Sequence, residues 1–97
     1  MNRNIQLVLN SCENLNLKVN SGEKYRITKN TIKSGSLWLE VQQEAYRLKL
    51  TGEVKSKLHV FVNQLTDIQP TEDQGDPVWH LPFTGYMEKV VNKLNEI

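Results

Sequence analysis

The stretch from Leu37 to Leu50, LWLEVQQEAYRLKL, decides the fold. Apolar and polar residues alternate on both sides of its centre, which is the period expected of β-strands with one buried face. We expect strands over Leu37–Gln42 and Ala45–Thr51, joined by a turn at Gln43 and Glu44. The predicted cross-strand pairs are Leu37 with Leu50, Leu39 with Leu48 and Val41 with Tyr46 on an apolar face, and Trp38 with Lys49 and Glu40 with Arg47 on a polar face. A shift of one residue would set every leucine opposite a polar residue, so both faces favour this register.

A third strand is expected next, because Leu58, Val60 and Val62 continue the alternation. That strand would set Phe61 beside Lys49 on the polar face. Aromatic rings and cations on one sheet face are typical of surfaces that stack bases and hold phosphates. The candidate binding face therefore consists of Trp38, Arg47, Lys49, His59 and Phe61.

Further strands are expected before this unit, over Ile5–Asn10, Leu15–Asn20 and Lys24–Thr28, where the same period of two recurs. Residues Lys29–Ser36 are polar and predict a loop, with Ile32 turned inward.

After the strands, residues 66–77 are rich in Asp, Glu, Gln, Pro and Gly and predict an exposed acidic loop. Residues 78–81 suit one more short strand. Residues 84–97 predict an amphipathic helix, because apolar residues recur on one helical stripe.

The predicted fold class is mainly β (α+β): six or seven short antiparallel strands rolled into a small barrel or bent sandwich, with one C-terminal amphipathic helix packed on it. One domain is expected over residues 1–97, with antiparallel strands in 1–65. This order resembles the pleckstrin-homology architecture, a likeness of topology without a sequence motif. The helix is expected to cover Trp38 and Phe61, with Trp79 in the same lid, although an arrangement that leaves both exposed stays open.

Composition indicates a soluble chain of the cytoplasm, since no stretch approaches the roughly 20 apolar residues of a membrane span. The single cysteine, Cys12, excludes an intrachain disulfide. Charge is divided unevenly: residues 1–62 hold ten Lys and Arg against five Asp and Glu, and residues 63–97 hold two against six. We expect the acidic segment to fold over the basic sheet and neutralise it, with an open basic surface as the alternative.

The sequence contains no catalytic, cofactor or metal-binding pattern, and we expect no enzyme, no cofactor and no metal site. His59 and His80 are the only histidines, and Asp76 with His80 is the only pair suggesting acid–base chemistry. The expected function is a small intracellular binding domain whose partner is another protein, docked at the acidic loop or along an open sheet edge. The alternative is a nucleic-acid-binding domain that uses the candidate binding face. The sequence leaves the oligomeric state open.

Overall fold

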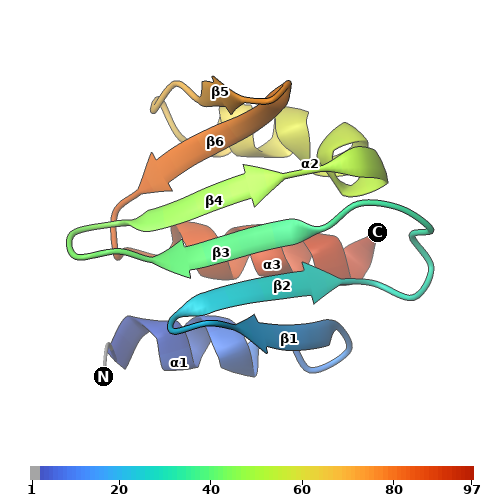
Figure 1. The fold of residues 1–97 in the computed structure, drawn as a ribbon, viewed down its shortest axis with the longest axis horizontal. Coiled ribbons are helices and arrows are strands. Elements are labelled where there is room, and N and C mark those ends of the chain that lie inside the picture. Colours follow the sequence, from blue (N-terminus) through green and yellow to red (C-terminus); the bar gives the residue numbers. More distant parts are fainter. Residues whose placement is uncertain (1–2) are drawn as a thin grey trace.

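The computed structural model describes residues 3–97, which form six strands and three helices (Figure 1). In chain order these elements are α1 (Arg3–Asn10), β1 (Asn16–Asn20), β2 (Lys24–Thr28), β3 (Leu37–Val41), β4 (Tyr46–Leu50), α2 (Gly52–Leu65), β5 (Thr71–Asp73), β6 (Asp76–Leu81) and α3 (Tyr86–Glu96).

The strands form one antiparallel sheet in the order β1-β2-β3-β4-β6-β5. Helix α2 connects β4 to β5, and the chain then returns through β6, which pairs with β4, so β5 becomes one edge of the sheet. The described helices lie on one face of the sheet (Figure 1). The expected α+β class with a C-terminal helix is confirmed, but the sheet is not closed, and the likeness to the pleckstrin-homology sandwich ends there. Helices bury the apolar face, so the sheet does not need to roll up on itself.

The predicted β3–β4 register is confirmed in every pair. Leu37 lies opposite Leu50 and Trp38 lies opposite Lys49. The amide of Gln42 donates to the carbonyl oxygen of Ala45 over 2.9 Å, which closes the predicted turn. This hairpin occupies the middle of the sheet, so its alternation assigns the two faces for the strands on either side.

The core lies between the leucine face of this hairpin and the helices, with Leu37, Leu39, Leu48 and Leu50 buried. Helix α3 crosses behind the centre of the sheet (Figure 1) and contacts both other helices. Its buried residues are Met87, Val90, Val91 and Leu94. The expectation that the helix covers Trp38 is therefore wrong: α3 packs on the opposite face, against the buried leucines of β3 and β4. Trp79 also belongs to this core and not to a lid over Trp38.

Residues Ile5–Asn10 were expected to be a strand, and this prediction is wrong because the segment belongs to α1. Two periods compete in it. The strand period would bury Leu7, which is 57% exposed, whereas the helical period joins Ile5, Val8 and Cys12, which are all buried. The helical period prevails because it gives α1 one continuous apolar side.

The third strand expected over Leu58–Val62 is also wrong, because the segment lies in α2. Val54, Leu58 and Val62 recur at intervals of four and are buried, whereas Val60 is 65% exposed. The strand interpretation used Val60 as an inward residue and left out Val54, so it missed the helical stripe.

The later segments agree better with expectation. Residues 78–81 do form a strand, as part of β6, and α3 lies within the predicted range 84–97. The acidic segment 66–77 is only partly a loop, since it contains β5 and the start of β6. Loop 29–36 is confirmed, and Ile32 is buried as expected.

Two glycines allow the junction between β4 and α2 to pack closely against the loop before β3. Gly35 (φ +86°) and Gly52 (φ +56°) have left-handed backbones, and a Cβ placed on Gly35 would lie 2.0 Å from the carbonyl oxygen of Thr51. The amide of Thr51 donates to the carbonyl oxygen of Ser36 over 3.0 Å at the same place. Side chains are excluded here because two backbones are in direct contact.

We predict that Gly35→Ala lowers the free energy of unfolding by about 3 kcal/mol or more, because a methyl group meets backbone that cannot move aside. The matched control is Gly75→Ala: Gly75 has nearly the same φ, +87°, but a Cβ there meets nothing within 4 Å. The control should lose only the strain of the left-handed backbone, about 1 kcal/mol. Urea unfolding of both variants measures the difference, and equal losses would contradict the close contact.

Candidate functional site

The face of the sheet opposite the helices, called here the open face, is covered by no described helix (Figure 1). Its central feature is a line of four cross-strand neighbours from β1 to β4. Lys18 lies opposite Arg26, Arg26 opposite Trp38, and Trp38 opposite Lys49. The indole is thus flanked by a cation on each neighbouring strand.

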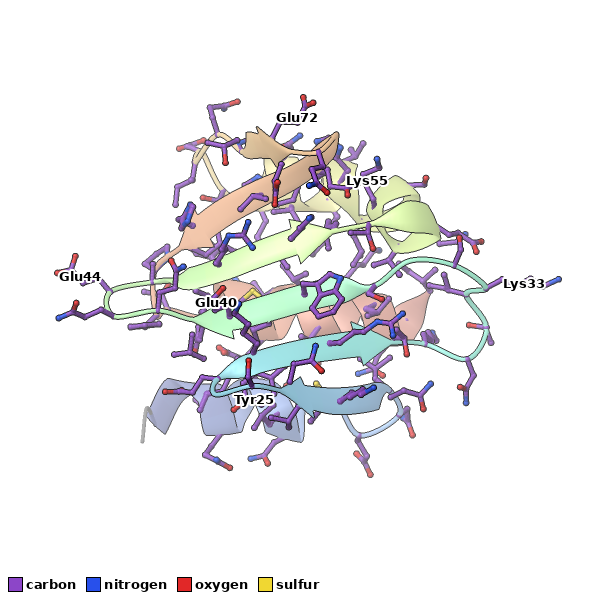
Figure 2. All side chains as sticks on the ribbon, viewed as in Figure 1. Tyr25, Lys33, Glu40, Glu44, Lys55 and Glu72 are labelled. Carbon is purple, nitrogen blue, oxygen red and sulfur yellow. The ribbon has the colours of Figure 1, made fainter. Side chains whose placement is uncertain are left out.

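A second line runs parallel to the first and is displaced from it by two residues along each strand. Lys24 lies opposite Glu40, and Glu40 lies opposite Arg47. Glu40 can be seen on β3 in Figure 2, which views the open face. The two lines together hold five cations, Lys18, Lys24, Arg26, Arg47 and Lys49, against the single carboxylate of Glu40.

Trp38 is half-buried, with the Arg26 guanidinium over its ring. The Cζ atom of Arg26 lies 5.7 Å from the ring centroid, within the range of a cation–π contact. The Nε atom of Arg26 donates to Ser36 Oγ over 2.7 Å, which fixes the guanidinium in place. Ring and guanidinium therefore form a positioned pair on the open face.

Two hollows lie on either side of this pair. The first, about 350 Å³, includes Lys24, Trp38, Arg47 and Lys49 in its walls. The second, about 410 Å³, is lined in part by Arg26 and Lys33, from β2 and the loop that follows it; Lys29 also borders it, but its ammonium donates to the carbonyl oxygens of Asn95 and Ile97 at the end of α3. Lys33 projects from that loop in Figure 2. Three cations and the carboxylate of Glu40 line the first hollow, and Arg26 and Lys33 line the second, so cations outnumber carboxylates on both sides of the pair.

Asp73, at the end of β5, reaches this surface from the acidic segment. Its Oδ2 atom lies 3.2 Å from Lys49 Nζ and 3.2 Å from Arg47 Nη2. The hydrogen bond and charge of Lys49, followed by those of Arg47, hold the pKa of the Asp73 carboxyl below its usual value. The ion pairs therefore persist above the ordinary carboxyl pKa and are lost only as the pH falls through the lowered one.

Three of the five predicted site residues share the open face: Trp38, Arg47 and Lys49. His59 and Phe61 do not, because α2 carries them to the helix side. The His59 ring packs edge-on against buried Trp79 at 5.4 Å, and Lys93 of α3 lies 5.5 Å from the Phe61 ring centroid. The expected neighbourhood of Phe61 and Lys49 is wrong for the same reason that the third strand is wrong.

Sequence reasoning missed three basic residues of the site: Lys18, Lys24 and Arg26. The signal was present, because the alternation in Lys24–Thr28 places Tyr25 and Ile27 on one face and therefore Lys24 and Arg26 on the other. What the sequence lacked was the order of the strands, which brings this polar face beside Trp38.

The other candidate groups are not assembled into a reactive site. Asp76 pairs with Lys55 at 3.2 Å, while His80 lies further along the same strand, opposite Arg47. Burial raises the pKa of the Cys12 thiol to about 11, which keeps it protonated and unreactive. Within residues 3–97 no group of three or more His, Cys, Asp or Glu side chains is placed to hold a metal ion. None of the helices in this range is long and apolar enough to cross a bilayer.

Comparison with models of known protein families, with curated proteins and with solved structures finds no match to this chain. The class of protein is therefore described from the structure alone: it is a one-layer antiparallel sheet backed by helices, with a basic surface centred on one tryptophan.

The two tryptophans should respond differently to truncation. Trp79→Ala removes a fully buried indole and is expected to cost about 3–5 kcal/mol of stability. Trp38→Ala should cost about 1 kcal/mol, since its ring lies on the open face. Thermal melts of both variants test this assignment of the faces, and a greater loss for Trp38 would refute it.

Proposed function

We propose that the protein binds single-stranded nucleic acid on the open face. The observation that carries this proposal is the line Lys18, Arg26, Trp38, Lys49, in which an aromatic ring is bordered by cations across neighbouring strands. Bases stack on aromatic rings and on guanidinium planes, and phosphates bind to lysine and arginine. This arrangement offers both kinds of group within one short span.

A single strand suits this surface better than a duplex. Stacking on Trp38 needs an unpaired base, and the Arg26 guanidinium, held over the ring by Ser36, would form part of the stack. The two basic hollows on either side of the pair would hold the flanking phosphates. The proposal keeps the cytoplasm, expected from the sequence, as the place of action, because nucleic acid is available there.

We predict that a fluorescein-labelled oligothymidylate or oligouridylate binds at low salt and quenches the fluorescence of Trp38. Trp38→Ala should weaken binding by about 1–3 kcal/mol through lost stacking. Lys49→Gln should lower the slope of log K against log salt by about one, because one phosphate contact is lost. Fluorescence anisotropy at several salt concentrations measures both effects.

The matched control is Lys57→Gln, which removes the same charge from an exposed position on α2, away from the open face. Its affinity and salt slope should stay close to those of the unmodified protein. Equal losses for Lys57→Gln and Lys49→Gln would mean that net charge alone attracts the strand. Absence of binding at low salt would end the proposal.

A second candidate function is protein binding through the β1 edge, the kind of partner first expected from the sequence. Among the described side chains, the exposed large apolar residues are Leu7, Leu17, Val19 and Val60, and all but Val60 belong to α1 and β1. Strand β1 pairs with β2 on one side only. Its sequence, NLKVN, is self-complementary in antiparallel pairing about Lys18, with asparagine opposite asparagine and leucine opposite valine. This favours a second copy of the chain as the partner.

Pairing of two β1 edges would also set Lys18 opposite its own copy, which costs stability. We therefore predict a weak dimer that strengthens as salt screens this repulsion, the opposite of the salt dependence of nucleic-acid binding. Val19→Lys should abolish the dimer, and Val60→Lys, the same change at an exposed valine of α2, should leave it intact. Sedimentation equilibrium at low and high salt measures this; a monomer throughout, or equal effects of both changes, would contradict the pairing.

A further inference from the structure

The contact of Asp73 with the open face is the strongest feature that the proposed function leaves unexplained. The Asp73 carboxylate bridges Arg47 and Lys49, whose side chains are 28% and 19% exposed. Both cations line the hollow beside Trp38. An internal anion therefore occupies a place where an external anion would bind.

The contact brings two cations to a single anionic oxygen. One oxygen, Oδ2, accepts from both Lys49 Nζ and Arg47 Nη2 at equal distances of 3.2 Å. Lysine and arginine are also the side chains that commonly bind phosphate oxygens, so the same two cations suit a phosphate. The Asp73 side chain is itself 45% exposed, so it is held from one side and is free to leave.

We propose that Arg47 and Lys49 form a phosphate subsite of the open face, and that Asp73 fills it in the free protein and is displaced when a strand binds. This inference rests on the proposed function and deepens it. The carboxylate lowers affinity in two ways: it occupies the two cations, and it repels an approaching phosphate. It also raises selectivity, since only a ligand that offers further contacts, such as a base on Trp38, displaces it.

The chain offers a matched pair for the test, because the adjacent residue Glu72 is also a carboxylate. Glu72 is exposed and lies at the outer edge of the sheet (Figure 2), and it lines a different hollow, together with Lys55 and His59. Asp73→Asn and Glu72→Gln change the net charge by the same amount at neighbouring positions. Any difference between them reports the contact of Asp73 with Arg47 and Lys49.

The experiment measures the affinity of the full chain for labelled oligothymidylate by anisotropy at about 50 mM salt. Asp73→Asn should tighten binding by about three- to tenfold, as expected for releasing two partly exposed ion pairs, and Asp73→Lys should tighten it further. Glu72→Gln should change it by less than about twofold. Equal gains for Asp73→Asn and Glu72→Gln, or no gain for Asp73→Asn, would overturn the inference.

A second measurement separates this inference from the proposed function. The pKa of the Asp73 carboxyl, followed by NMR, should rise toward its usual value when the oligonucleotide is added, because phosphate takes over the two cations. If the strand binds but the pKa of Asp73 stays low, the subsite is elsewhere and only this inference fails. If neither the unmodified protein nor Asp73→Asn binds, the proposed function fails and this inference fails with it.

Discussion

Pairing of the leucines across β3 and β4 is the constraint on which the rest of the structure depends. Leu37 opposite Leu50 and Leu39 opposite Leu48 create a strip that must be covered, and α3 covers it. Because side chains alternate along a strand, the same pairing forces Trp38 and Lys49 to the other face. Core and candidate site are thus two results of one register, and neither can change without the other.

Much of the sheet follows from the sequence, because a period of two leaves few alternatives once both faces agree. Strands β1 to β4 are predicted from alternation, and so is the exact partner of each residue in the central hairpin, while residues 78–81 of β6 are predicted as a short strand. The two missed helices show where this reasoning fails. In short segments such as Ile5–Asn10, both periods fit the apolar residues, and only the surface available for packing decides between them. Helices could cover the apolar face of the sheet, so these segments did not have to form further strands.

The candidate site was half predicted, for a related reason. Residues on β3 and β4 were placed correctly because their register was known. His59 and Phe61 were lost with the third strand, and Arg26 was overlooked because no local pattern shows which strand lies beside β3. The division of charge along the sequence did anticipate one contact. An acidic segment was expected to neutralise the basic sheet, and Asp73 does so at Arg47 and Lys49. Most of the other basic residues of the open face come from β1 and β2, on the far side of the sheet from β5.

The position of α3 has a consequence for how the chain folds during its synthesis on the ribosome. Asn95 Nδ2 donates to the carbonyl oxygen of Ser11 over 2.7 Å, and Lys29 Nζ donates to the carbonyl oxygens of Asn95 and Ile97. The end of α3 thus joins two segments made long before it. The six strands of residues 3–97 are all synthesised before α3, so a nascent chain exposes the leucines of β3 and β4 until α3 has been made. During that interval the apolar face of the sheet is exposed to association with other chains.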